Sequence, residues 1–339
     1  MIIDSAKKMH RDIMETRQYR KARSDLIHLY EVATRGREGR LGSIIGPSGI
    51  GKSTLVEDFC QDISAESVKN GEKQPFLRIK VPPKPSLRSF YEHLLKALGA
   101  PCAPRDTNED RRVRILQFIK KLGVRIIILD EFQHLAKTAG SDQMGVCDVL
   151  KSLMNDGQVG IIVVGILEAE AILQQDEQIL RRRYLAIRLY PFCDPQNLPA
   201  SNDNKSARSA DLAEFKAVVK NYAKGFGCPD TTYILEDEVA ERLLAYTRGT
   251  FGRIVNFIEA SAKDATCRNK TGIDEEAIRA TVRSQNLNFE DTTLLFGPEE
   301  SPQIRVRGKK SKAKMEKGER QFLSSLGHFR SDKLGEVGR

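Results

Sequence analysis

The residues with the clearest chemical role lie in the stretch GPSGIGKST, from Gly46 to Thr54. Residues 46–53 fit the pattern GxxxxGK[ST], which binds phosphate when it follows a strand and opens a helix. The glycines let the backbone curl so that its N–H groups converge on phosphate oxygens, and the helix dipole favours the negative charge. Lys52 should neutralise the β- and γ-phosphates, and Ser53 should offer its hydroxyl to Mg²⁺. We therefore predict an ATP site whose binding residues are Gly46, Pro47, Ser48, Gly49, Ile50, Gly51, Lys52, Ser53 and Thr54.

The run IIILDEF, residues 126–132, supplies the carboxylates that such a site needs. A buried parallel strand would place Asp130 at its carboxyl end, where open α/β sheets bind their ligands. We expect Asp130 to hold Mg²⁺ together with Ser53, and Glu131 to polarise a water for in-line attack on the γ-phosphate. This arrangement predicts hydrolysis rather than transfer, because a kinase would need a hydroxyl substrate in place of that water. An Asp-Glu pair at a strand end is a weak signal by itself. Here it indicates a nucleotide site because it follows the phosphate loop in the sequence, at the end of a predicted strand.

Two arginine-containing stretches could complete the site. DEQILRRRY, residues 176–184, precedes a predicted strand, and an arginine there could reach a neighbour's nucleotide if subunits stack head to tail. We expect Arg183 to stabilise the transition state in this way, with Arg182 as the second choice. GTFGR opens a predicted helix, and Arg253 could contact the γ-phosphate from there. The alternative in both cases is an exposed arginine at a helix end.

These residues require a scaffold of buried strands that alternate with helices. Nearly continuous apolar runs are typical of parallel strands buried on both faces. The runs lie at residues 41–45, 76–81, 124–130, 159–165 and 184–189. Their alternation with helical patterns predicts an α/β fold with a parallel sheet flanked by helices. Together they would form an ATPase core.

Five segments are predicted along the chain. Residues 1–40 are charged and helical, and residues 41–192 form the ATPase core. Residues 193–210 are rich in Pro, Asn, Ser and Asp, which predicts a linker or loop. Residues 211–288 repeat apolar residues at helical spacing, which predicts a small all-helical lid. Residues 289–339 form a basic, flexible tail, whose stretch 303–320 could contact DNA, dock a partner or simply keep the chain in solution.

Composition narrows the class of protein. The 339 residues include 55 Lys and Arg against 46 Asp and Glu, a modest excess that favours polyanionic partners but also suits an ordinary protein with a lysine-rich tail. The six cysteines form no CxxC pair and no cluster with histidine, which predicts a reduced, cytoplasmic protein without a zinc-type metal site. No run of about 18 apolar residues occurs, so we expect no membrane partner.

With these motifs in place, the chain resembles the AAA+ ATPases of the TnsC/TniB family, the ATP-dependent regulators of Tn7-like transposition. The resemblance covers roughly residues 20–285 and depends on the following stretches: GPSGIGKST, IIILDEFQHL, DEQILRRRYLAIRLYPF, TRGTFGRIVNFIEASAKDA and the proline segment FLRIKVPPKPSLRSFYEHLLKALGAP. It implies a protein that binds ATP and assembles as rings or helical filaments around duplex DNA. It also implies that the protein links a target-selecting protein to the transposase. The residues that would carry the family's roles are Lys52, Asp130, Glu131, Arg183 and Arg253.

One position departs from the family pattern. The tip of the fourth strand often carries a threonine, whereas this chain has Ile166 there. An isoleucine side chain cannot hydrogen-bond a phosphate or a water. We therefore expect hydrolysis to be slow, unless a nearby polar residue such as Gln133 substitutes. Nucleotide binding is not affected by this departure.

Duplex DNA would be held by contacts to its phosphates, which provide affinity but little sequence information. The loop VPPKPSLRS, residues 81–89, suits this role because prolines stiffen a turn from which polar side chains project. The predicted DNA contacts are Lys80, Lys84, Ser86 and Arg88; the alternative is an ordinary exposed turn. A second basic cluster is more typical of an exposed helix face and consists of Arg111, Arg112 and Arg114.

Three other functions remain open from the sequence. A replication-initiator or clamp-loader-like ATPase shares the phosphate motifs, although no C-terminal DNA-reading domain is recognisable after residue 285. A small-molecule kinase also uses a phosphate loop, but the Asp-Glu pair and the helical lid with GTFGR count against it. A signalling scaffold that binds nucleotide as a switch would show no dependence on DNA.

Overall fold

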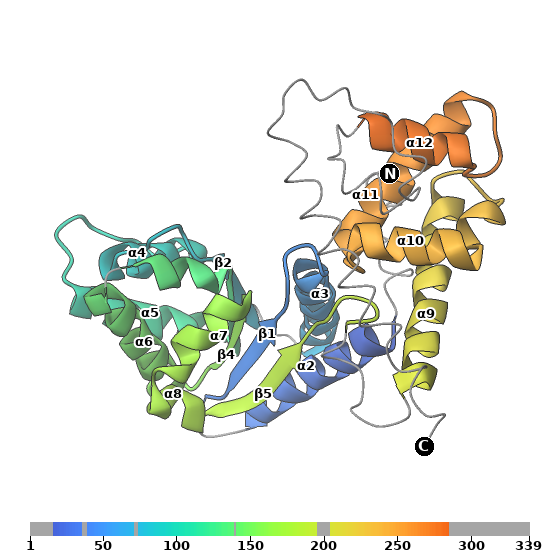
Figure 1. Ribbon diagram of the computed structural model, residues 1–339. Coiled ribbons are helices and arrows are strands. Elements are labelled where there is room, and N and C mark those ends of the chain that lie inside the picture. The colour runs from blue at the N-terminus through green and yellow to red at the C-terminus, as the bar shows by residue number, and fades with distance from the viewer. Residues whose placement is uncertain (1–15, 36–38, 71–73, 139, 195–203, 285–339) are drawn as a thin grey trace, which may run out of the picture. The chain divides into compact units, whose positions relative to one another are not determined.

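The computed structural model describes residues 16–35, 39–70, 74–138, 140–194 and 204–284 (Figure 1). The predicted basic tail, 289–339, and its stretch 303–320 lie outside the described residues. The first part of the predicted N-terminal extension, residues 1–15, also lies outside them.

The centre of the fold is a five-stranded sheet in which every pair of neighbouring strands is parallel. Its strands are β1 (Leu41–Ile45), β2 (Phe76–Lys80), β3 (Ile126–Asp130), β4 (Gly160–Gly165) and β5 (Arg183–Arg188), in the spatial order β2-β3-β4-β1-β5. Every residue of β1, β3 and β4 is buried, as the continuous apolar runs predict, whereas the edge strands β2 and β5 alternate. The strands differ from the predicted ones only at their ends. Because they are parallel, the phosphate loop after β1 and the Asp-Glu pair after β3 meet at one edge.

Helices cover both faces of the sheet. One face carries α2 (Arg17–Arg35) and α3 (Lys52–Asn70), and Gly42 of β1 makes room for Leu29 on this side. The other face packs against α4 (Leu87–Ala97), α5 (Asn108–Leu122), α6 (Gly140–Asn155), α7 (Leu167–Gln174) and α8 (Glu177–Arg181). Leu41, Ile127 and Val163 lie in the apolar core of this second face. The predicted fold class, a parallel sheet flanked by helices with a helical lid, is confirmed.

The lid follows β5 and is built from helices. Its elements are α9 (Asn204–Gly225), the short 3₁₀ helix η2 (Tyr233–Leu235), α10 (Asp237–Thr247), α11 (Phe251–Cys267) and α12 (Glu275–Ser284). Helix α9 begins inside the segment predicted as a linker, because Asn and Ser, which are common in loops, are also preferred at the starts of helices. The ring of Phe192, just after β5, lies 5.7 Å from that of Phe215 and 5.2 Å from that of Phe251. An aromatic cluster therefore joins the end of the sheet segment to the lid. None of the helices within the described ranges is long and apolar enough to cross a membrane.

Candidate nucleotide-binding site

The phosphate loop connects β1 to α3, as the sequence predicts. Gly49 and Gly51 have φ angles of 75° and 101°, which residues with a Cβ atom rarely adopt. A Cβ atom on Gly46 would lie 2.7 Å from the carbonyl oxygen of Leu189, so the chain needs glycine there as well. The loop therefore has the curled backbone that exposes N–H groups to an anion.

Lys52 begins α3 and folds back over the loop. Its Nζ donates to the carbonyl oxygens of Gly46 and Pro47, at 2.7 Å and 2.9 Å. Burial lowers the pKa of Lys52, while the nearby carboxylates of Glu131 and Asp130 partly oppose this shift. The ammonium group thus lies between the loop and two carboxylates, where it can exchange its carbonyl partners for phosphate oxygens.

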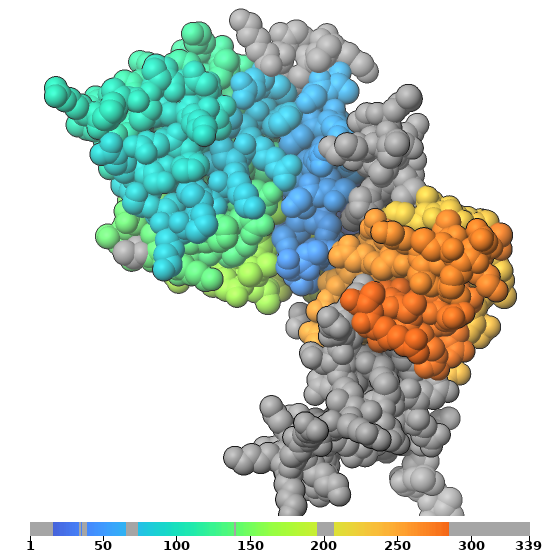
Figure 2. Space-filling model, turned by 90° about the horizontal axis from the view of Figure 1, so that it is seen from above, coloured from blue at the N-terminus to red at the C-terminus, as the bar shows by residue number. Residues whose placement is uncertain are grey.

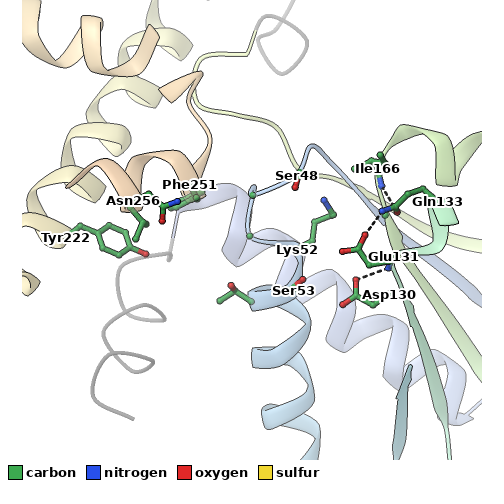
Figure 3. Close-up of a pocket in the computed structure, with 16 residues that line it drawn as sticks. Ser48, Lys52, Ser53, Asp130, Glu131, Gln133, Ile166, Tyr222, Phe251 and Asn256 are labelled. Carbon is green, nitrogen blue, oxygen red and sulfur yellow. Dashed lines mark hydrogen bonds between the residues drawn. The ribbon is translucent and has the colours of Figure 1, made fainter. Parts of the chain in front are cut away.

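A cavity of about 460 Å³ opens beside this loop (Figure 3). Its size falls within the range of small-molecule sites. It is lined by Ser48, Gly49, Gly51, Lys52, Ser53, Thr54, Asp130, Glu131, Gln133, Gly165, Ile166, Tyr222, Phe251, Gly252, Val255 and Asn256. Most of the predicted nucleotide-binding residues are in this set. Gly46, Pro47 and Ile50 are not, and they shape the loop from behind or from its outer side.

Asp130 and Glu131 reach the cavity from the end of β3. The Asp130 side chain is 13% exposed, and its Oδ2 accepts a hydrogen bond from Arg78 Nη2 at 2.7 Å. Its Oδ1 accepts from the backbone N–H of Glu131 at 3.0 Å. Glu131 has φ 59° and ψ 37°, a left-handed conformation that costs a non-glycine residue about 1–3 kcal/mol and is common at functional sites. The turn directs the Glu131 carboxylate into the cavity (Figure 3).

Gln133 connects Glu131 to the tip of β4. Its Nε2 donates to Glu131 Oε2, and its Oε1 accepts from the backbone N–H of Ile166 at 3.4 Å (Figure 3). A Cβ atom on Gly165 would lie 2.7 Å from Gln133 Oε1, so the glycine provides the space that the amide occupies. A polar side chain therefore stands beside the apolar Ile166, and it comes from the 3₁₀ helix η1 (Phe132–Lys137).

The lid contributes residues to the cavity that sequence reasoning missed. Tyr222 comes from α9, and Gly252, Val255 and Asn256 lie on one face of α11, as helical periodicity requires. The backbone N–H of Gly252 donates to the carbonyl oxygen of Gly49 at 2.8 Å, which joins the start of α11 to the phosphate loop. The motif GTFGR drew attention to this helix start, and its periodicity could have identified these positions.

Arg253 lies in the same turn but on the exposed side of α11. It does not line the cavity, and among the described residues no ion pair or hydrogen bond of its side chain is found. The predicted contact with the γ-phosphate therefore remains a proposal.

Arg183 is held by an ion pair within the chain. Its Nη2 contacts Glu170 Oε1 at 2.9 Å and Ser43 Oγ at 3.3 Å, and Glu170 is almost fully buried. Arg188 binds the other Glu170 oxygen at 2.8 Å. Burial opposes ionisation of Glu170, but the hydrogen bonds from Arg183 and Arg188 outweigh it and lower its pKa. Arg183 thus ties the start of β5 to α7. Its predicted contact with the nucleotide of a neighbouring subunit stays a prediction.

The neighbouring arginines are placed differently. Arg182 is half-buried, and its Nη1 is enclosed without a hydrogen-bond partner among the described residues. The side chain of Arg181, at the end of α8, is 81% exposed and lies 3.5 Å from Glu177. Of the run RRR, Arg181 is the residue classed as exposed, whereas Arg182 and Arg183 are partly buried.

The four predicted DNA-contacting residues divide into two pairs. Lys80 and Lys84 are exposed, at the end of edge strand β2 and in the turn after it. Ser86 instead caps α4, because its side chain accepts from the N–H of Ser89 at 3.1 Å. Arg88 pairs with Glu92 at 2.8 Å and donates to the carbonyl oxygen of Pro104. Strand β2 and helices α4 and α5 lie on the outside of the core, where their cyan and teal atoms form a continuous surface (Figure 2).

The second basic cluster is held by ion pairs within the protein. Arg111 is 2% exposed and lies under α4, so it is not on a solvated helix face. Arg112 pairs with Glu109 and Asp156, at 2.7 Å and 2.9 Å. Arg114 pairs with Asp106. These arginines stabilise the α4–α5 region and leave little positive charge for a partner.

Comparison with known families decides the relationship of this chain. The sequence model of the bacterial TniB protein family matches residues 7–192, more than half of the chain. The chain belongs to the TniB family. The resemblance seen in the motifs of this TniB-family chain is thereby confirmed. No curated protein matches it.

Several solved structures are similar in fold to this TniB-family protein. The Aeropyrum pernix ORC2 protein, solved in ADPNP–ADP complexes, is 17% identical, with a TM-score of 0.56, and the match covers 80% of this chain and 68% of that one. Cdc6p from Pyrobaculum aerophilum is 12% identical, with a TM-score of 0.57 and the same two coverages. The Aeropyrum pernix ORC1 protein in complex with DNA is 15% identical, with a TM-score of 0.51, covering 81% and 67%. At these identities the likeness shows that the chain shares the fold of the ORC and Cdc6p structures.

Proposed function

We propose that this protein is an ATPase that assembles on duplex DNA when it binds ATP and links target selection to a transposase. The observation that carries the proposal is the convergence of Lys52, Ser53, Asp130 and Glu131 on one cavity. Membership in the TniB family supports the connection with Tn7-like transposition. The ORC1 protein whose fold is similar was solved in complex with DNA, which supports DNA as a partner.

The residues at the cavity suit nucleotide hydrolysis. The N–H groups of the loop and the ammonium of Lys52 would bind the triphosphate. Ser53 and Asp130 fit Mg²⁺, because hydroxyl and carboxylate oxygens are the ligands this hard cation prefers and both residues line the cavity. When bound, Mg²⁺ would neutralise charge that develops on the phosphates. Glu131 would accept the proton of the attacking water, and Gln133 would hold the carboxylate of Glu131 in place.

Assembly would place an arginine of one subunit at the nucleotide of the next. We assign this role to Arg181, because its exposed side chain can reach a neighbour whereas Arg183 is bound to Glu170. Arg253 is the candidate for a contact from the lid of the same subunit. Lys80 and Lys84 would contact DNA phosphates, which predicts sequence-tolerant binding that weakens steeply as salt increases.

A second candidate is an AAA+ ATPase associated with DNA in another process, of the replication-initiator or clamp-loader kind. The fold similarity to the ORC2 and Cdc6p structures favours it. Binding of a purified transposase to the DNA-bound multimer would support the first candidate over the second.

Electron microscopy with ATP, with and without duplex DNA, tests the shared part of both candidates. We expect multimers of the unmodified protein only when both are present. Lys52→Ala should stay monomeric, Glu131→Gln should form multimers that persist, and Lys96→Ala, an exposed lysine outside the cavity, should behave as the unmodified protein does. Multimers of Lys52→Ala at the same protein concentration would overturn the proposal. Solitary molecules under every condition would do the same.

A further inference from the structure

Asp130, the proposed magnesium ligand, has a cationic partner on the neighbouring strand. Arg78 lies in the middle of β2, opposite Ile128 of β3, and its guanidinium reaches along the sheet to Asp130. The two side chains are 33% and 13% exposed, and Nη2 lies 2.7 Å from Oδ2. Oδ1 is engaged by the backbone N–H of Glu131. Both oxygens of Asp130 therefore accept hydrogen bonds from the protein itself.

We propose that Arg78 is a positioning residue that competes with Mg²⁺ for Asp130, and so sets the Mg²⁺ concentration at which nucleotide is bound. This inference rests on the proposed function, because it takes Asp130 as the metal ligand. Two cations that share one carboxylate repel each other, and the repulsion is stronger at a carboxylate that is only 13% exposed than between fully solvated groups. Mg²⁺ must either displace the guanidinium of Arg78 or bind beside it. Either way, a higher Mg²⁺ concentration is needed to occupy the site.

Other cations near Asp130 do not replace this role. Lys52 is another cation at the cavity, but its Nζ donates hydrogen bonds to carbonyl oxygens of the phosphate loop and not to Asp130. Lys80, which lies opposite Asp130 in the strand register, is exposed and makes no ion pair within the described residues. Arg78 is the residue whose side chain contacts the Asp130 carboxylate.

The chain offers a matched control for removal of this ion pair. Arg23 of α2 pairs with Asp62 of α3 at 2.7 Å, and its side chain is 32% exposed, close to the value for Arg78. Neither Arg23 nor Asp62 lines the cavity. Arg23 holds Asp62 through two hydrogen bonds, so Arg23→Gln removes an ion pair with at least as many contacts as that of Arg78, at residues that do not line the cavity.

The experiment titrates Mg²⁺ at a fixed concentration of a fluorescent ATP analogue and measures the half-saturating Mg²⁺ for nucleotide binding. Arg78→Gln should lower this concentration about tenfold, near the lower end of what a hydrogen bond to a charged group contributes. Arg78→Lys, which retains the charge, should stay within about threefold of the unmodified protein. Arg23→Gln should leave it unchanged. If Arg78→Gln does not fold, the titration is repeated with Arg78→Met, which keeps the aliphatic part of the side chain and removes its charge.

The outcomes distinguish failure of the role assigned to Arg78 from failure of the proposed function. If the unmodified protein binds the analogue but Arg78→Gln, or Arg78→Met in its place, needs as much Mg²⁺ as it does, the role of Arg78 is overturned and the proposed function stands. If Arg78→Lys shifts as far as Arg78→Gln, charge competition is also overturned. If the unmodified protein binds no nucleotide with or without Mg²⁺, the proposed function fails and the inference fails with it.

Discussion

Replacement of Gln133 by alanine tests whether this amide takes over from the missing polar residue at the tip of β4. The change removes the donor to Glu131 Oε2 and the acceptor for the N–H of Ile166. A hydrogen bond to a charged group contributes about 1.5–3 kcal/mol. If that energy holds Glu131 in its reactive orientation, kcat should fall by about tenfold to a hundredfold. Removal of the base itself, in Glu131→Gln, should cost about as much or more.

Phosphate release at saturating ATP and Mg²⁺ measures this effect, with nucleotide affinity measured separately. We expect the affinity of Gln133→Ala to change by less than about threefold, because the phosphate loop supplies most of the binding contacts. Gln174→Ala, at an exposed position at the end of α7, should have normal kcat. In the Glu131→Gln background the same change at Gln133 should have little further effect, since both act on one carboxylate.

Gly165→Ala provides an independent route to the same state. Its new Cβ atom would lie 2.7 Å from Gln133 Oε1 and 2.6 Å from the Cβ atom of Ala169, so the amide must move while its chemistry is unchanged, and α7 must shift as well. The variant should therefore lose kcat as Gln133→Ala does. Full kcat in Gln133→Ala, with an inactive Glu131→Gln, would refute the reasoning.

Two further predictions concern stability and thiol chemistry. Glu170→Gln should lower the free energy of unfolding, measured by denaturant titration, by roughly 2 kcal/mol; this is less than for a fully buried pair because the Arg188 side chain is 47% exposed. The ion pairs lower the pKa of Glu170 below its usual 4.5. The stability difference between the two proteins should therefore be present above pH 4.5 and disappear as pH falls below it. Burial raises the pKa of the Cys60 thiol from 9.0 to about 12. Alkylation at pH 8 should therefore modify exposed Cys102 and spare Cys60 until the protein unfolds. The contribution of the neutral Cys60 thiol to the free energy of unfolding should be lost as pH rises from 9 toward 12. Equal labelling of the two cysteines in the folded protein would contradict the first point, and peptide mass spectrometry measures it.

The phosphate loop and the Asp-Glu pair could be predicted because their signals are local. GPSGIGKST specifies its own backbone through glycine, and the apolar run before Asp130 specifies a buried strand without reference to the rest of the chain. The apolar runs indicated where the strands lie, but not which strands pair, and the edge strands β2 and β5 are only partly buried. The phosphate loop, the Asp-Glu pair and the existence of the strands were therefore predictable before any contact was known, whereas the strand order was not predicted.

The roles of the arginines could not be predicted in this way. In the sequence RRR the three side chains are chemically identical, and their difference arises from Glu170 on another helix, which binds Arg183 and leaves Arg181 in solvent. Ser86 and Arg88, predicted to contact DNA, also cap α4 and pair with Glu92, and the sequence alone did not indicate these local partners. Tyr222 and Asn256 join the cavity only because the lid packs near the phosphate loop. Long-range pairing, rather than residue type, decides each of these cases.

The structure also joins the loop proposed to contact DNA to the residues proposed to act on the nucleotide. The N–H of Val81 donates to the carbonyl oxygen of Asp130 at 2.8 Å, and the carbonyl oxygen of Val81 accepts from His134 Nδ1 at 2.8 Å. Both backbone groups at the start of the loop are therefore held by the segment that carries Glu131. If Lys84 contacts DNA as proposed, a shift of this loop must alter the surroundings of Asp130. Linkage then requires the effect to be reciprocal: DNA that changes nucleotide affinity by some factor will itself be bound more or less tightly by that same factor when nucleotide is present.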